Sequence, residues 1–302
     1  MHVTTESKEL PPRKGKQIKG KRPFSFHPVS FTGKAITYFV LVGWVIFVFY
    51  AVGWLVLSSL STTREIFTNN LLASGLHFEN YINALTTHNL ALYFVNSTLY
   101  VTFALGLIVL IAAPASYVLS RANFRGRSVF NSLFVAGMGI PGAMLLIPLF
   151  MAFIRLNLVN TIQGLLLVYV TVSIPFTVFF LTGFFASLPR EIEEAGLMDG
   201  CTDWQVFWKL MLPLAQPGLI TVTIFNFIAL WNDYFWALIF VNSEQRRTLM
   251  LGLEALLRSM RYTGDWAGLF ASVIIVFLPT FILYVILSEK IIAGVTAGAV
   301  KS

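Results

Sequence analysis

The sequence contains few charged residues for its length. Only 12% of its 302 residues are Asp, Glu, Lys or Arg, whereas about a quarter of a soluble globular protein is charged. Hydrophobic residues make up 57% of the chain, and the mean hydropathy is +0.76. Because a surface that faces water needs charge, this composition excludes an ordinary soluble protein. It predicts a chain whose surface largely faces lipid.

Cysteine, paired histidines and catalytic motifs are also missing. Cys201 is the one cysteine, so no intramolecular disulfide can form, and none of the four histidines has a neighbour at metal-ligand spacing. We therefore expect no metal site. The chain has no G-x-S-x-G, H-E-x-x-H or G-x-x-x-x-G-K-[ST] motif. We expect no catalytic residue, no enzyme activity and no bound cofactor, so ATP and Mg²⁺ would act in a partner chain.

Positive charge is concentrated at the N-terminus. The net charge is +7 and the pI is about 9.6, which could suggest nucleic-acid binding. Eight of the 21 Lys and Arg residues, however, precede Ala35. Cationic ends of membrane proteins usually lie in the cytoplasm beside anionic lipid. We therefore predict a basic cytoplasmic tail over 1–34, contact with membrane lipid and no nucleic-acid partner.

Six apolar runs are long enough to cross a bilayer, which takes about 20 helical residues. Five of them contain no Asp, Glu, Lys or Arg, and the fifth run contains one acid, Asp233. Since backbone polar groups in lipid must be bonded internally, each run is expected to be a helix. The predicted fold is an all-α polytopic membrane bundle with spans over Ala35–Leu60, Tyr93–Leu119, Val129–Ile154, Thr161–Ala186, Gly218–Val241 and Ala267–Leu287.

The distribution of Lys and Arg predicts the orientation of these spans. With a cytoplasmic N-terminus, 15 of them lie inside and 6 outside. We therefore expect a multi-pass inner-membrane protein with both termini in the cytoplasm. The predicted divisions are the N-terminal tail 1–34, a first transmembrane helix 35–60, an extracytoplasmic loop 61–92, a core of five helices 93–292 with a cytoplasmic loop 187–217, and a cytoplasmic C-terminal tail 293–302.

The loop between the fourth and fifth spans has strong local signals. Acidic residues open a first short helix, and Gly200 suits the position that ends it. Thr202 and Gln205 form a capping box for a second helix, whose aromatic residues fall on one face. An amphipathic pair lying in the headgroups is one interpretation. The lipid headgroups of the inner leaflet carry negative charge, so an acidic loop would be repelled by them. The acidity of the loop therefore favours the second interpretation, a docking element for another protein.

This loop resembles the signature of binding-protein-dependent ABC importer permeases, E-A-A, three residues, G, nine residues, I, one residue, L-P. Two positions depart from that pattern. Gly196 stands where the second Ala is usual, which could loosen the first helix by up to about 1 kcal/mol, and Leu210 replaces Ile. The positions that match are Glu194, Ala195, Gly200, Leu212 and Pro213.

Other segments are similar to the permeases of carbohydrate uptake systems, and the end of the chain resembles the second permease of maltose-type transporters. The likeness extends from about Phe78 to Ser302. Its segments are Asn80–Tyr81, Asn96–Ser97, Arg125–Arg127, Trp231–Trp236 and Gly294–Lys301.

The resemblance implies a mechanism and partners. A second permease of six to eight helices would form a heterodimer with this chain around a path for a sugar. Two copies of an ABC ATPase would bind below, and an extracytoplasmic solute-binding protein would deliver the substrate. The loop would be the coupling helix for one ATPase. Glu194 would pair with a cationic group of that ATPase, Gly200 would permit the turn, and Leu210, Leu212 and Pro213 would anchor the loop to the bundle. The full set of coupling residues implied is Glu194, Ala195, Gly196, Asp199, Gly200, Leu210, Leu212 and Pro213.

Asp233 and its neighbours are candidates for the substrate path. Ionisable residues within membranes usually face the bundle interior or a cavity, and sugars are commonly held by polar and aromatic side chains. Asp233 has two possible roles at this point. It is either a contact or gate for the sugar, or an anchor at the membrane interface. The candidate path residues are Asn226, Trp231, Asn232, Asp233 and Tyr234.

Two alternatives to a sugar importer remain. One is an ABC importer permease for another solute, such as glycerol phosphate or a peptide, and the four arginines of the last outer loop make an anionic solute conceivable. The other is a self-contained secondary transporter, which usually needs several buried acids or broken helices for its coupling ion. One acid within the spans is poor support for it.

Overall fold

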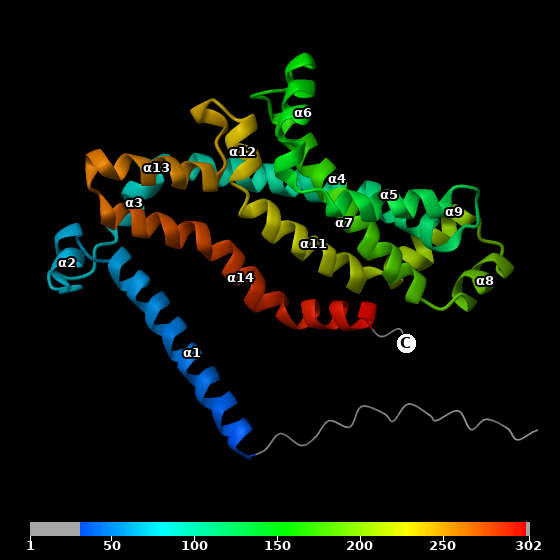
Figure 1. Ribbon diagram of the computed structural model, residues 1–302, viewed down its shortest axis with the longest axis horizontal. Coiled ribbons are helices and arrows are strands. Elements are labelled where there is room, and N and C mark those ends of the chain that lie inside the picture. The colour runs from blue at the N-terminus through cyan, green and yellow to red at the C-terminus, as the bar shows by residue number, and fades with distance from the viewer. Residues whose placement is uncertain (1–30, 300–302) are drawn as a thin grey trace, which may run out of the picture. The chain divides into compact units, whose positions relative to one another are not determined.

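The computed structural model describes residues 31–299, without the side chains of 31, 32, 261 and 290–299. Most of the predicted basic tail therefore lies outside the described residues. The described part consists of helices and loops without a strand, which confirms the all-α prediction for it. Its α-helices are α1 (Phe31–Ser59), α2 (Thr63–Thr68), α3 (Glu79–Thr86), α4 (Leu90–Arg121), α5 (Arg127–Gly139), α6 (Gly142–Arg155), α7 (Ile162–Ser187), α8 (Glu191–Met198), α9 (Asp203–Val206), α10 (Leu212–Leu214), α11 (Gln216–Trp231), α12 (Phe235–Phe240), α13 (Leu249–Thr263) and α14 (Trp266–Ala299). A π-helix, η1 (Phe207–Met211), and a 3₁₀ turn, η2 (Glu244–Arg246), complete the set (Figure 1).

The chain divides into two compact units, residues 1–51 and 52–302. In the first unit, α1 exposes large apolar side chains around its whole circumference, including Phe39 at 81% and Phe49 at 76% exposed. A helix that is hydrophobic on every side is stable in lipid and not in water. This part of α1 therefore has the surface of a membrane span.

In the second unit, α4 packs against α7 over much of its length. Ser116 on α4 is buried, and its hydroxyl donates to the carbonyl of Val178 on α7 at 3.2 Å, as small residues allow where two backbones approach closely. The opposite face of α4 carries an exposed apolar stripe at helical spacing, Leu92, Val95, Leu99, Phe103, Leu107 and Leu110. A helix has two apolar faces when one face packs against protein and the other face contacts lipid.

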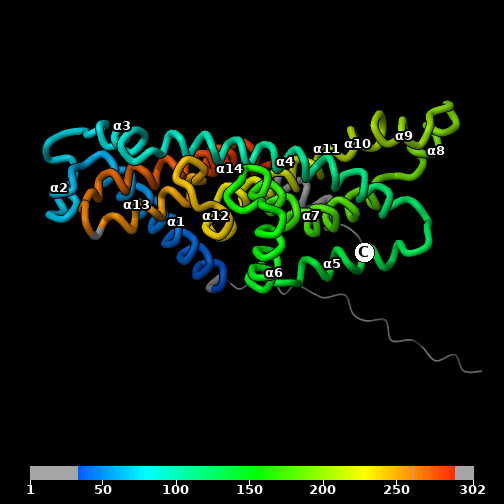
Figure 2. The backbone as a smooth tube through the Cα atoms, turned by 90° about the horizontal axis from the view of Figure 1, so that it is seen from above, coloured from blue at the N-terminus to red at the C-terminus, as the bar shows by residue number. Residues whose placement is uncertain are grey.

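The predicted third span is broken. It forms two helices, α5 and α6, whose axes differ by 103°. The break falls at Ile140 and Pro141, and Ile140 has extended backbone angles. Proline lacks an amide hydrogen and disfavours a helical conformation in the residue before it. The prediction of one continuous helix over Val129–Ile154 is therefore wrong, and Figures 1 and 2 show α6 turned away from the direction of α5.

The predicted fifth span is also interrupted. Helix α11 ends at Trp231 and α12 begins at Phe235. The Asp233 carboxylate accepts hydrogen bonds from the backbone amides of Trp236 (3.2 Å) and Ala237 (3.0 Å). A side chain that accepts hydrogen bonds from these amides caps the start of α12, and this cap competes with the continuation of α11. The single span predicted over Gly218–Val241 is therefore wrong in this respect.

Four described helices are long and apolar enough to cross a membrane: α1, α4, α7 and α14. Two bent pairs raise the number to six when each pair is counted as one span. These pairs are α5 with α6, and the segment Asp203–Leu214 with α11, bent by 70°. The number of predicted spans equals this upper count, but the predicted fifth span, Gly218–Val241, shares only α11 with the second pair. Helix α14 continues to Ala299, so most of the segment predicted as a C-terminal tail is helical.

The second unit has two hydrophobic clusters at different levels of the bundle. One contains buried residues of α4, α7, η1 and α11, including Phe185, Phe207 and Met211. The other contains residues of α4, α7, α11, α12, α13 and α14, including Trp231 and Phe240. Figures 1 and 2 place α8 and α9 at one end of this bundle, called the loop end below, and α13 at the opposite end, called the α13 end.

Candidate functional site

The predicted helix–turn–helix is present at the loop end. Helix α8 ends at Met198 with Asp199 as its C-cap, and Gly200 follows with φ +84°. This left-handed conformation favours glycine, which has no Cβ. The amide of Cys201 donates to the carbonyl of Gly196 at 3.0 Å. Both bonds of the predicted capping box between Thr202 and Gln205 are formed. The turn chemistry of the sequence thus produces the local structure that it predicts.

The second half of the loop is less regular than predicted. After α9 the chain forms the π-helix η1, in which the amide of Leu212 donates to the carbonyl of Phe207. The next residue, Pro213, has no amide hydrogen to donate. Phe207 and Met211 are buried, but Trp204 is 66% exposed and Trp208 38% exposed. The expected single aromatic face therefore divides between the core and the surface.

Gly196 is buried against the second helix of the loop. A Cβ built on it would lie 2.5 Å from Leu210 Cδ1 and 3.4 Å from Val206 Cγ2. The absence of a side chain therefore lets α8 and η1 approach closely. The predicted loosening of α8 by this glycine concerns backbone propensity, and the structure adds a packing role, because Leu210 would have to move to make room for a Cβ at this position. The two departures from the permease signature, Gly196 and Leu210, are in contact with each other.

Arg121, at the last residue of α4, holds α8 to the bundle. Its guanidinium group donates to the carbonyl oxygens of Phe185 and Leu188, each at 2.7 Å, where α7 ends. Its Nε lies 2.9 Å from Glu193 Oε1, with both side chains largely buried. Burial raises the pKa of Glu193, and the positive charge of Arg121 opposes that rise. Sequence analysis missed Arg121, whose only signal was its place after the second apolar run.

Aromatic side chains make a second connection between the loop and the bundle. The ring of Tyr117 on α4 lies 5.6 Å from that of Phe185 on α7 and 5.1 Å from that of Phe207 on η1, measured between centroids. Aromatic pairs at this separation stabilise beyond their burial. The loop is thus attached to α4 and α7 by both polar and apolar contacts.

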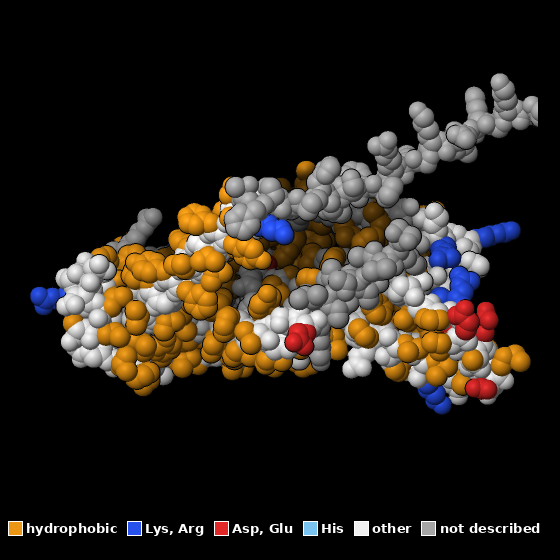
Figure 3. Space-filling view, turned by 90° about the horizontal axis from the view of Figure 1, so that it is seen from below, with side chains coloured by type: hydrophobic (Ala, Val, Ile, Leu, Met, Phe, Trp, Pro, Cys, Tyr) orange, Lys and Arg blue, Asp and Glu red, His pale blue; other side chains and the backbone are white. Residues whose placement is uncertain are grey.

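The tip of the loop presents acidic and apolar side chains together. Glu194 is exposed, and no described residue forms a hydrogen bond or an ion pair with its carboxylate. Met198 is 87% exposed and Trp204 is 66% exposed. Figure 3 shows charged side chains gathered at the loop end, while the long sides of the bundle are mostly hydrophobic. Exposed apolar residues rimmed by charge are typical of a protein-binding surface.

The other predicted coupling residues lie around this tip. Ala195, Asp199 and Gly200 are exposed, and Pro213 is exposed in α10. Leu210 and Leu212 are half-buried and pack against the cluster at the loop end. The structure therefore brings the predicted set into one element, with a surface part on α8 and an anchoring part in η1 and α10.

The predicted path residues do not form one exposed site. Asn226 is buried and donates to Thr177 Oγ1 at 2.9 Å. Trp231 is 3% exposed, and its indole nitrogen donates to the carbonyl of Val276 at 3.1 Å. Asp233 accepts from the Tyr169 hydroxyl at 2.9 Å in addition to the two amides of α12. These polar groups are bonded within the chain.

Two of the predicted path residues remain accessible. Asn232 is exposed, and its amide nitrogen donates to the carbonyl of Ile228 at 2.8 Å, one turn earlier. Tyr234 is half-buried, and its hydroxyl accepts from Arg258 at 3.4 Å. These side chains lie beside the break between α11 and α12.

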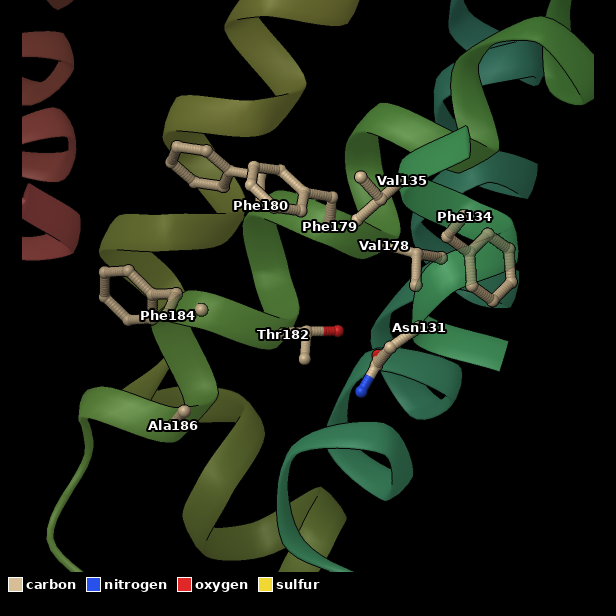
Figure 4. A pocket seen from close by; sticks show the side chains of 10 residues that line it. Asn131, Phe134, Val135, Val178, Phe179, Phe180, Thr182, Phe184 and Ala186 are labelled. Carbon is tan, nitrogen blue, oxygen red and sulfur yellow. The ribbon is translucent and has the colours of Figure 1, made fainter. Parts of the chain in front are cut away.

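A cavity of about 480 Å³ lies between α5 and α7 (Figure 4). Its lining is apolar apart from Asn131 and Thr182, which come from the two helices. A hydroxyl-rich sugar needs several hydrogen-bonding groups for specific binding. The cavity therefore has few of the groups that such a ligand requires.

Comparisons with known proteins identify the family. Residues 104–293 match the family described as "Binding-protein-dependent transport system inner membrane component". The matched segment includes α7, the whole loop and α11.

Individual relatives cover most of the chain. It is 37% identical over 268 residues to the diacetylchitobiose uptake system permease protein NgcG of Streptomyces coelicolor, covering 88% of this chain and 89% of the relative. It is 30% identical over 278 residues to the arabinooligosaccharides transport system permease protein AraQ of Halalkalibacterium halodurans, covering 89% and 98%.

A solved structure has a similar fold. It is a chain from the crystal structure of a bacterial ABC transporter involved in the import of the acidic polysaccharide alginate. The TM-score is 0.75 at 25% sequence identity, and the match covers 87% of this chain and 98% of that chain. The extent of these matches, together with the helical bundle and the loop at its end, means that this chain belongs to the family of binding-protein-dependent transport inner membrane components and is a multi-pass transport permease.

Proposed function

We propose that this chain is one of the two permease subunits of an ABC importer that carries a sugar or oligosaccharide into a bacterial cell. The observation that carries the proposal is the acidic and apolar tip of α8, fixed to the ends of α4 and α7. The printed names of the relatives, which concern diacetylchitobiose and arabinooligosaccharides, support a carbohydrate. A second permease of six to eight helices would complete the translocation path.

In this proposal the loop end lies in the cytoplasm, as do both termini. The tip of α8 then contacts one of two ATPase subunits, which bind the ATP and Mg²⁺. Glu194 is available for a cationic group there, because no described residue pairs with it. Met198, four residues after Glu194 in α8, and Trp204 in α9 supply exposed apolar area on the same loop. The α13 end faces the extracytoplasmic solute-binding protein.

The substrate path is proposed to pass the break between α11 and α12. Asn232 and Tyr234 are its candidate contacts in this chain, since their side chains remain accessible. Asn226, Trp231 and Asp233 would support the path from behind, because their polar groups are engaged inside the bundle. A sugar hydroxyl at Asn232 could donate to the amide oxygen, which accepts no hydrogen bond from a described residue.

The coupling role is tested by reversing one charge. In the importer purified through a tag on this chain, Glu194→Lys is expected to reduce the amount of co-purified ATPase or its ATP hydrolysis. Glu191→Lys, an exposed acid at the start of the same helix, is the matched control for charge and is expected to have a smaller effect. Equal behaviour of the two variants would contradict the role of Glu194.

The substrate class is tested by uptake. Cells with and without this chain are given radiolabelled diacetylchitobiose, an arabinooligosaccharide, glycerol phosphate and a short peptide. The proposal predicts that loss of the chain abolishes uptake of a carbohydrate and leaves the other solutes unaffected. Selective loss of glycerol phosphate or peptide uptake would support the alternative importer instead.

A further inference from the structure

The ends of α4, α7 and α8 converge on a single arginine. Arg121 donates to two carbonyl oxygens at the end of α7, those of Phe185 and Leu188. It also forms an ion pair with Glu193, which belongs to the first turn of α8. One planar side chain thus touches three elements that are separate in the sequence. We call this arrangement of Arg121, Glu193 and the two carbonyls the staple.

Burial makes the staple different from a surface ion pair. The Arg121 side chain is 7% exposed and that of Glu193 is 16% exposed. Surface pairs are screened by water and contribute little, whereas removing one partner of a buried pair leaves the other charge without compensation. Arginine suits the position because its five donors have a fixed planar geometry and can bond several acceptors at once.

The neighbouring acids of α8 are directed to different environments. Glu193 turns towards Arg121, while Glu194 is exposed to solvent at the tip. Consecutive residues of a helix do not share a face. One carboxylate of α8 can therefore hold the helix to the bundle while the next contacts a partner.

From this geometry we infer that Arg121 is a positioning residue, which fixes the angle of α8 against α4 and α7 so that the three helices move as one body. This inference rests on the proposed function, in which α8 receives the motion of an ATPase. Rigid-body transmission requires that the receiving element does not pivot at its attachment. Without the staple, the Gly200 turn and the aromatic contacts remain, and α8 pivots about them.

The test measures a distance within this chain by pulsed electron paramagnetic resonance. Spin labels are attached to Met198→Cys at the tip and Leu107→Cys on the exposed face of α4, in a Cys201→Ser background. Leu107 is 14 residues before Arg121, or about 21 Å along the helix. The distance is recorded in the purified importer without nucleotide and with ATP, Mg²⁺ and vanadate.

The expected result is one narrow distance in the unsubstituted protein, unchanged between the two nucleotide states. Arg121→Ala and Glu193→Gln are expected to broaden the distribution or to make it depend on nucleotide. Arg121→Lys, which keeps the charge and can still pair with Glu193, is expected to restore part of the sharpness. A residue needed only for folding would give no such graded recovery in protein that is already folded.

Arg127→Ala is the matched control. Arg127 also donates to carbonyls at the end of α4, those of Leu119 and Ser120, but it forms no ion pair with α8. Its removal is expected to leave the distance unchanged. Unchanged distances in Arg121→Ala and Glu193→Gln, or a nucleotide-dependent distance in the unsubstituted protein, would overturn the inference. If no ATPase co-purifies with this chain, the proposed function fails, while the nucleotide-free distances still decide on the staple.

Discussion

Gly196 and Leu210 are in direct contact, and a Cβ on Gly196 would lie 2.5 Å from Leu210 Cδ1. This contact relates the two positions at which the loop departs from the permease signature. A glycine at one position leaves room for the branch of a leucine at the other. The pair sets the separation between α8 and η1, and therefore the position of the tip.

Gly196→Ala is expected to destabilise the protein although alanine favours helices. Overpacking against Leu210 costs about 1–3 kcal/mol, and the gain in helix propensity is about 1 kcal/mol. Leu210→Val in the same chain removes the clashing branch and should recover part of the loss, which thermal unfolding in detergent would measure. Gly183→Ala on α7 is the control, because nothing lies within 4 Å of its built Cβ. Additive effects of the Gly196 and Leu210 substitutions would show that the two residues are not coupled.

Gly200→Ala tests the turn at the end of α8. The left-handed conformation at φ +84° costs a residue with a Cβ about 1–2 kcal/mol. Asparagine tolerates this conformation better than alanine. The melting temperature of Gly200→Asn should therefore lie between those of Gly200→Ala and the unsubstituted protein. The same order is expected in the amount of ATPase that co-purifies. Identical behaviour of Ala and Asn would mean that backbone strain does not determine the turn.

Asp233→Ala is predicted to lower stability, because it removes three hydrogen bonds that connect α7 and α12. Each hydrogen bond to a charged group contributes about 1.5–3 kcal/mol, so a loss of at least that size is expected by thermal unfolding. Asn232→Ala, at an exposed neighbour, should leave stability nearly unchanged and weaken substrate uptake instead. The reverse pattern would indicate that Asp233 contacts the substrate and Asn232 supports the fold.

Glu65 makes stability depend on pH. Hydrogen bonds from Ser74 and Thr62 lower the pKa of its carboxyl group from 4.5 to about 2. A carboxyl group with a lowered folded-state pKa stabilises the fold above its unfolded pKa, and this contribution is lost as pH falls through the window from 4.5 to about 2. Glu65→Gln should therefore lose less stability than the unsubstituted protein between about pH 5 and pH 3. An equal loss in both proteins would exclude Glu65 as a source of the acid sensitivity.

Much of the fold follows from the sequence because the apolar runs are long. The runs at Tyr93–Leu119 and Thr161–Ala186 became α4 and α7 nearly as predicted, since about 20 apolar residues leave a helix as the stable form in lipid. The breaks were harder to predict. Pro141 and the glycines beside it are compatible with a kink, but in the sequence they do not distinguish a kink from ordinary close packing of helices. The break at Asp233 is stabilised by hydrogen bonds from amides in the first turn of α12. Helix α12 begins there only because α11 has ended, so the sequence alone does not show these bonds.

The site was predicted in part for a similar reason. The Gly200 turn and the Thr202 cap are local, so their residue types were enough. The staple and the contact of Gly196 with Leu210 were not predictable, because they depend on how α8 packs against other elements. Arg121 and Glu193 are 72 positions apart in the sequence, and no periodicity relates them.

The central claim is that the tip of α8 contacts a nucleotide-hydrolysing partner. It is tested most directly by a photoreactive benzophenone residue placed at Met198, which is 87% exposed, in cells that express the complete importer. The same group at Tyr262, 91% exposed in α13, serves as the control at the other end of the bundle. We predict that position 198 captures an ATPase subunit and that position 262 does not. Capture of the ATPase from position 262, or from neither position, would contradict the claim.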